Sequence, residues 1–160
     1  MKGWCDFSSP LADIQPLGHV DQQAYQAFKQ QNSTNVRLAF FFTVYADAPF
    51  VKRLFLHLYS SHHYYLFHID PAGASADFEK DLRLLGKGRD NVHFAKDIRI
   101  VYGASTATIL LTKAMAWFDL HATGWDYFVP LTGSDYPLIP LHRIEKIFQT
   151  QQPPMPFVMG

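Results

Sequence analysis

The feature that most constrains the fold is a run of consecutive apolar residues that follows a polar lead-in. Residues 37–45 read Arg-Leu-Ala-Phe-Phe-Phe-Thr-Val-Tyr, with aromatic and β-branched side chains at most positions. A strand with one solvated face alternates apolar and polar residues, and this run does not alternate. The run therefore predicts a strand buried on both faces, as in a parallel sheet covered by helices.

The residues after this run alternate between helical and extended patterns. Asp47 can cap the next helix, Pro49 suits its first turn, and Pro130 either ends the last strand or weakens its assignment. This alternation predicts an α/β fold with a mostly parallel sheet, flanking helices and right-handed crossovers. The elements expected after the first strand are a helix at 50–59, a strand at 64–69, a helix at 74–85, a strand at 91–95, a helix at 105–121, a strand at 125–131 and a helix at 141–149.

The chain divides into a polar lead-in and one folded region. Residues 1–35 contain six Gln and show weak periodicity, whereas residues 36–160 carry the alternating pattern. A further strand is expected to begin at 156–158, so we expect residues 36–160 to be an incomplete domain. No run of about 18 apolar residues is present, and residues 1–10 do not resemble a signal peptide.

Composition excludes several classes of function. Fourteen Lys and Arg balance fourteen Asp and Glu, so the chain has no electrostatic footprint for general nucleic-acid binding. The single cysteine, Cys5, excludes an internal disulfide framework and a cysteine-based zinc site. Hydrophobic residues make up 48% of the chain, which is typical of a globular protein.

Polar residues follow three of the predicted strands, where ligands bind in open α/β sheets. They occupy residues 45–47, 68–70 and 132–135. If the strands are neighbours, Asp70 and Asp135 could face one cleft and accept hydrogen bonds from a sugar hydroxyl or bind a cation. The alternative is that both are turn residues, since Pro71 and Pro137 follow closely.

Other motifs are weaker. Residues 86–88 (Gly-Lys-Gly) lack the spacing of a phosphate-binding loop, Ser134 lacks a nucleophile elbow, and the histidines lack the spacing of a helical zinc motif. The turn before the helix at Ser105 can offer backbone amides to an anion or a sugar oxygen, or Ser105 can simply cap the helix. The residues alone thus indicate a nucleotide- or sugar-binding α/β half-domain.

Four segments, in order, resemble the core-2/I-branching and peptide O-xylosyltransferase family of glycosyltransferases. The first is the strand and helix at 38–59. The second, residues 64–70 (Tyr-Tyr-Leu-Phe-His-Ile-Asp), is similar to the family's tyrosine-rich strand that ends in His-Val-Asp. The third is residues 100–105 (Ile-Val-Tyr-Gly-Ala-Ser), and the fourth is residues 125–138, which contain Trp-Asp-Tyr-Phe and Asp-Tyr-Pro-Leu. The resemblance extends from about residue 37 to the end of the chain.

This resemblance implies a GT-A-like fold, in which a Rossmann-type nucleotide-binding half precedes an acceptor half. It implies a UDP-sugar donor, with xylose slightly favoured over N-acetylglucosamine and with glucuronic acid also open. It implies inverting transfer to a protein serine or a glycan hydroxyl. Members of the family are typically Golgi membrane proteins that act on the luminal side, so any membrane anchor would lie outside this chain.

The resemblance also assigns roles to six residues. Thr43 and Tyr45 would line the uracil pocket, and Asp70 would contact the nucleoside. Tyr102 and Ser105 would lie near the nucleotide, and Asp135 would lie beside the donor sugar or diphosphate. Three departures affect the details of the base pocket: Tyr45 where His is common, Pro130 in place of Asn, and Thr132 in place of Ser.

The resemblance further implies transfer without a metal or other cofactor. Residues 68–70 (His-Ile-Asp) hold one carboxylate where many glycosyltransferases have Asp-x-Asp, and one carboxylate is a poor Mg²⁺ site. The family's catalytic base and phosphate-binding cations lie later than Gly160, so no catalytic residue is assigned and this chain alone is expected to be inactive. Two alternatives stay open: a non-catalytic nucleotide- or carbohydrate-binding module, and an unrelated flavodoxin-like domain.

Overall fold

The protein is built around a parallel four-stranded sheet with helices on both faces. The computed structural model describes residues 36–95, 99–101 and 105–150. The strands are β1 (Leu38–Val44), β2 (Tyr64–Ile69), β3 (Val92–Ala95) and β4 (Tyr127–Thr132), in the order β3-β2-β1-β4. All three pairings are parallel, which confirms the predicted α/β fold.

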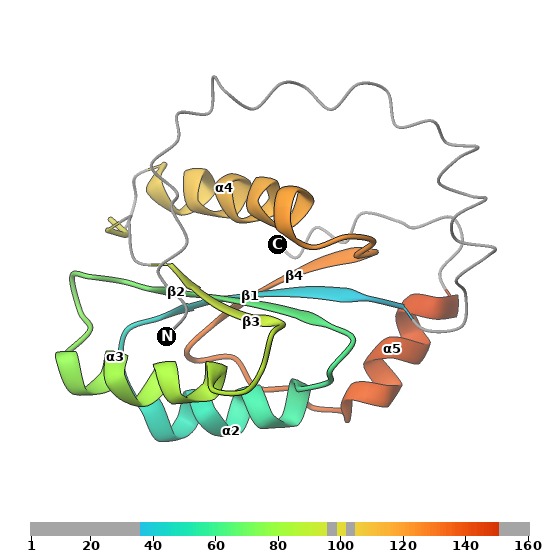
Figure 1. Cartoon of the computed structure of the whole chain (residues 1–160), viewed down its shortest axis with the longest axis horizontal. Helices are drawn as coiled ribbons and strands as arrows, with labels where there is room; N and C mark the ends of the chain where they lie inside the picture. The colour runs from blue at the N-terminus through green and yellow to red at the C-terminus, as the bar shows by residue number, and fades with distance from the viewer. Residues whose placement is uncertain (1–35, 96–98, 102–104, 151–160) are drawn as a thin grey trace.

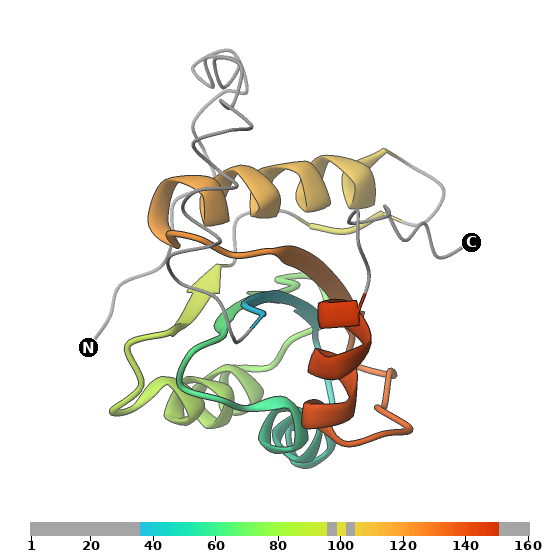
Figure 2. The same ribbon diagram turned by 90° about the vertical axis from the view of Figure 1, so that its right-hand side faces the viewer.

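The helices form a layer on each face of the sheet (Figures 1 and 2). Helix α4 (Thr106–His121) covers one face, and helices α2 (Ala48–Leu58) and α3 (Ala76–Arg83) cover the other. Helix α5 (Leu141–Thr150) packs on the α2 side through partly buried apolar residues. The helix predicted at 74–85 is shorter than expected, because its end tightens into a 3₁₀ turn at Leu84–Gly86.

Strand β1 lies between β2 and β4 and is buried on both faces, as its sequence predicts. Phe40 and Phe42 contribute to the core under α2 and α3, whereas Ala39 and Phe41 contribute to the core under α4. Since successive side chains of a strand point to opposite faces, both sets must be apolar. The continuous apolar run therefore reflects two cores that share one strand.

The two ends of helix α2 follow its sequence. The Asp47 carboxylate accepts a hydrogen bond from the Phe50 amide at 3.0 Å, and Pro49 stands in the first turn. Both features were predicted from the sequence. The helix buries Val51, Leu54, Phe55 and Leu58, which recur at helical spacing.

The order of the strands determines where a ligand site can form. From β1 the chain steps to β2 and then β3 on one side, and β4 then pairs with β1 on the other side. In open α/β sheets, ligands bind beyond the carboxyl ends of the strands where the direction of winding reverses. Here that position lies between the ends of β1 and β4.

Pro130 lies within β4, which is an edge strand among the described residues, and an edge tolerates a residue without an N–H group.

The described helices include none that is long and apolar enough to cross a bilayer.

Candidate functional site at the carboxyl edge of the sheet

A cavity of about 300 Å³ lies at the reversal point between β1 and β4. We call it the carboxyl-end cavity. Its walls come from the segment that joins β1 to α2 and from the turn after β4. The lining residues are Tyr45, Ala46, Asp47, Phe50, Gly133 and Ser134.

Thr43 lies beside this cavity, near the end of β1. It pairs in register with His68 on β2 and with Thr132 on β4, so these three residues form a row across the sheet on the α4 face. The Thr43 hydroxyl donates to the Leu131 carbonyl at 3.3 Å, and the His68 side chain is fully buried. Thr43 is one of the six predicted site residues, and the register places beside it His68 and Thr132, which belong to the polar groups predicted at 68–70 and 132–135.

Tyr45 connects the cavity with the loop that carries Asp70. Its side chain is 55% exposed, yet its ring lies so close to Gly73 that a Cβ atom on Gly73 would stand 2.9 Å from Tyr45 Cδ2. Gly73 follows β2 by four residues, so the loop after β2 approaches Tyr45 directly. The structure thus brings Tyr45 and the Asp70 loop together.

The carboxylates of Asp70 and Asp135 both take part in turns. Asp70 Oδ1 accepts a hydrogen bond from the Ala72 amide at 2.9 Å, and Asp135 Oδ2 accepts one from the Thr132 amide at 2.5 Å. Strands β2 and β4 are not neighbours, because β1 lies between them. Asp70 and Asp135 therefore follow strands about 10 Å apart, on either side of the end of β1.

The segment before α4 carries the last two predicted site residues. Ser105 is exposed at the first turn of α4, but its side chain makes no capping hydrogen bond. Instead, the Thr106 hydroxyl accepts from the Val101 amide at 2.9 Å. Since α4 connects two parallel strands, its first turn lies toward the carboxyl edge of the sheet. Tyr102 lies outside the described residues.

Two lining residues were not among the six predicted site residues, although Asp47 belongs to the polar group at 45–47 that follows the first strand. Asp47 adopts left-handed backbone angles, φ 54° and ψ 61°, and it lines the cavity while it caps the helix. Phe50 forms an aromatic wall, and the Tyr136 ring packs against it at a centroid distance of 5.7 Å. A left-handed Asp cannot be recognised from a cap motif alone, and spacing along a helix does not reveal an aromatic wall.

The described lining of the cavity carries a negative charge and no positive charge. Asp47 is its lining carboxylate, and none of its described lining residues is basic. Arg53 is not a lining residue, and its guanidinium lies 5.8 Å from the centre of the Phe50 ring. The described lining therefore suits hydroxyl and amide groups better than a phosphate.

One cluster of potential metal ligands lies at the amino ends of the strands, opposite the carboxyl-end cavity. The side chains of His62, His63 and Glu145 approach one another closely enough to share an ion, and His63 Nε2 is 3.0 Å from Glu145 Oε1. However, His63 Nδ1 accepts the Leu38 amide at 3.3 Å, which leaves the proton of a neutral ring on Nε2. A metal ion would have to replace that proton on Nε2. This arrangement therefore fits a contact between α5 and the start of β2 better than a set of metal ligands.

The ionisation of His63 agrees with that arrangement. Burial, and secondly the nearby His62, lowers the pKa of His63 to about 4, although Glu145 opposes the shift. The side chain is fully buried, so the ring is neutral at pH 7. His63 is therefore a core residue that bonds the backbone of β1.

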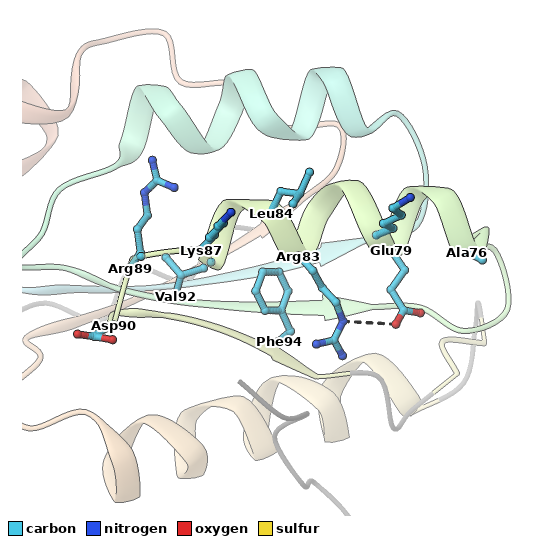
Figure 3. A pocket seen from close by; sticks show the side chains of 12 residues that line it. Ala76, Glu79, Arg83, Leu84, Lys87, Arg89, Asp90, Val92 and Phe94 are labelled. Carbon is cyan, nitrogen blue, oxygen red and sulfur yellow. Dashed lines mark ion pairs between the residues drawn. The ribbon is translucent and has the colours of Figure 1, made fainter. Parts of the chain in front are cut away.

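A larger groove runs along α3 and β3 (Figure 3). Its volume is about 750 Å³, and the Phe94 ring packs against Gly86, where a Cβ atom would stand 2.7 Å from Phe94 Cε2. The Arg83 guanidinium lies 5.9 Å from the centre of that ring and pairs with Glu79 at 3.4 Å. The groove borders β3, the edge strand opposite β4, and its lining includes none of the five predicted site residues that the structure describes.

Comparison with known proteins identifies the family. The profile of the Core-2/I-Branching enzymes matches residues 38–159, which is most of the chain. The chain belongs to the Core-2/I-branching enzyme family. This confirms the resemblance to these glycosyltransferases, and the parallel sheet with flanking helices is a GT-A-like arrangement.

The curated relatives of this Core-2/I-branching domain include two xylosyltransferases. Xylosyltransferase 2 from Pan troglodytes is 29% identical over 115 residues, and xylosyltransferase 2 from Homo sapiens is 28% identical over 115 residues. Each alignment covers 70% of this chain and 13% of the relative. The chain thus spans a small part of the length of the curated relatives it matches.

Proposed function

We propose that this chain provides the donor-binding half of an inverting UDP-sugar glycosyltransferase, with the nucleoside in the carboxyl-end cavity. The observation that carries the proposal is the position of this cavity at the reversal point of a parallel sheet, within a Core-2/I-branching domain. Thr43, Tyr45 and Asp70 would contact the nucleoside. Tyr102, Ser105 and Asp135 would lie around the rest of the donor.

Xylose is the donor sugar that we propose first, because both relatives above are named xylosyltransferases. N-acetylglucosamine is the second candidate, and the acceptor would be a protein serine or a glycan hydroxyl. We also propose transfer without a metal, because the segment at 68–70 holds one carboxylate. The proposed location is the luminal side of the Golgi membrane.

Catalysis would need groups beyond those described in this site. Inverting transfer needs a base that removes the proton of the acceptor hydroxyl as the anomeric carbon is attacked. The carboxylates of Asp70 and Asp135 each hold a turn amide, so neither is an obvious base. We therefore propose that the 160-residue chain binds the donor but does not transfer the sugar.

The turnover prediction is tested with radiolabelled donors. The purified 160-residue chain should bind UDP yet give no transfer from UDP-xylose or UDP-N-acetylglucosamine to serine peptides or glycans above a no-enzyme control. A longer natural polypeptide that contains this chain should give turnover with one of the donors. Robust turnover by the 160-residue chain would contradict its proposed inactivity, and binding without turnover by the longer polypeptide would favour a non-catalytic module.

Substitution of Gly73 tests the role of Tyr45. In the Gly73→Ala variant the added methyl would lie 2.9 Å from Tyr45 Cδ2, so the tyrosine ring and the loop at Gly73 must shift relative to each other. We expect UDP binding to weaken about tenfold, which corresponds to about 1.4 kcal/mol. Isothermal titration calorimetry would measure this change.

Gly86→Ala provides the matched control, because its Cβ atom would stand 2.7 Å from Phe94 Cε2, a comparable conflict in the groove along α3 and β3 and away from the cavity. Its affinity for UDP should stay within about twofold of the unmodified chain, a difference of less than about 0.5 kcal/mol. Equal effects of the two substitutions would mean that the position of Tyr45 does not matter for binding.

A further inference from the structure

Asp47 is held at the wall of the carboxyl-end cavity by the start of helix α2. Its carboxylate accepts the Phe50 amide and its carbonyl accepts the Val51 amide, both at 3.0 Å. Its backbone is left-handed, and it is the described non-glycine residue with a positive φ. Few residue types besides glycine adopt this conformation readily, and Asp is one of them. The carboxylate is thus fixed in place where it lines the cavity.

The same arrangement removes the usual anion site of a helix start. A free helix N-terminus attracts phosphate because its first amides point outward without partners. In α2 the Phe50 amide is bonded to the Asp47 carboxylate and Pro49 has no N–H group, while the Val51 amide makes the first ordinary helical bond to the Asp47 carbonyl. A phosphate placed here would meet a carboxylate and few available donors.

The other lining groups suit an uncharged ligand. Phe50 offers an aromatic face that Tyr136 supports, and Ser134 adds a hydroxyl. An ionised carboxylate has about four lone-pair positions, so Asp47 can bond the Phe50 amide and still accept a hydrogen bond from a ligand. A flat or ring-shaped group with hydroxyl or N–H donors matches this lining.

We infer that Asp47 determines the specificity of the carboxyl-end cavity: it accepts a hydrogen bond from the uncharged nucleoside part of the donor and keeps the phosphates out. This inference rests on the proposed function, because it assumes that a nucleotide occupies the cavity. It also fixes the orientation of the donor, since the diphosphate must lie away from the start of α2.

The test compares uridine with uridine 5′-monophosphate on the 160-residue chain and its Asp47→Asn variant. Asn keeps an oxygen for the Phe50 amide and tolerates left-handed angles, but it removes the charge. We expect uridine to bind about fivefold more weakly to the variant. The ratio of the dissociation constant of the monophosphate to that of uridine should fall about threefold, because the variant lacks the repulsion between the Asp47 carboxylate and the phosphate. This fall should largely vanish when the comparison is repeated in 1 M NaCl.

Asp81→Asn is the charge-matched control, because Asp81 is exposed on α3 and does not line the cavity. It should leave both dissociation constants unchanged. If Asp47→Asn fails to fold, Asp47→Gly replaces it, since glycine adopts left-handed angles without strain; it should lower the ratio in the same way.

The outcomes separate the two claims. If the unmodified chain binds uridine and UDP, and the Asp47 and Asp81 variants give the same constants and ratios as the unmodified chain, the inference about Asp47 is overturned and the proposed function stands. If the unmodified chain shows no saturable binding of uridine or UDP, the proposed function itself fails and the inference falls with it.

Discussion

The free energy of unfolding of this chain should include a contribution from His63 that falls by about 3 kcal/mol as the pH drops from 6.5 to 4. The folded protein lowers the pKa of His63 to about 4 from an ordinary value of 6.5, mainly through burial. Between these values the unfolded chain binds the proton and the folded chain does not. The contribution is therefore complete above pH 6.5, decreases through this window and is lost below pH 4.

Urea unfolding at pH 7, 5.5 and 4 would measure this effect in the unmodified chain and in His63→Asn. Asn retains an acceptor for the Leu38 amide but does not titrate. Between pH 6.5 and 4, the free energy of unfolding of the His63→Asn variant should therefore fall by about 3 kcal/mol less than that of the unmodified chain. The exposed neighbour provides the control, because His62→Asn should keep most of the dependence. Identical pH profiles for the unmodified chain and His63→Asn would show that His63 is not buried in its neutral form.

Replacement of Phe42 by Ala should lower the free energy of unfolding by about 3–5 kcal/mol, because it leaves a cavity in a closely packed core. Phe42 is fully buried on the central strand, and its ring stacks on that of Phe67 at a centroid distance of 4.5 Å. The effect is large because the Phe42 ring lies within the core under α2 and α3. Chemical denaturation of the purified variant measures it.

Two controls define this result. Phe42→Leu retains most of the apolar volume and should cost less than about 1.5 kcal/mol. Leu138→Ala removes an apolar side chain that is 96% exposed and should change stability by less than about 0.5 kcal/mol. A Phe42→Ala variant as stable as the Leu138→Ala variant would contradict the position of β1 at the centre of the sheet.

The elements of this fold could be predicted because their causes are local. The apolar run at 37–45 and the helical spacing from Val51 to Leu58 both appear in the sequence, and the structure places β1 and α2 there. The cap at Asp47 was predicted for the same reason. The break at Leu84 was missed, because the helical spacing of apolar residues continues through the 3₁₀ turn.

The order of the strands could not be predicted, because it depends on contacts between distant segments. Nothing local indicates that β4 pairs with β1 and not with β3. The possibility that Asp70 and Asp135 share a cleft depended on neighbouring strands, and β1 separates them. The close contact of Tyr45 with Gly73 and the left-handed angles of Asp47 are equally invisible in sequence patterns.

The most direct test of the central claim is an NMR titration of the isotope-labelled 160-residue chain with UDP. If the carboxyl-end cavity is the donor site, UDP should cause saturable changes in the chemical shifts of the amides of Thr43, Tyr45, Asp70, Gly133 and Ser134. The residues around Phe94, in the groove along α3 and β3, should stay unchanged. Changes confined to that groove, or no saturable change at all, would contradict the claim that the carboxyl edge of the sheet binds the donor.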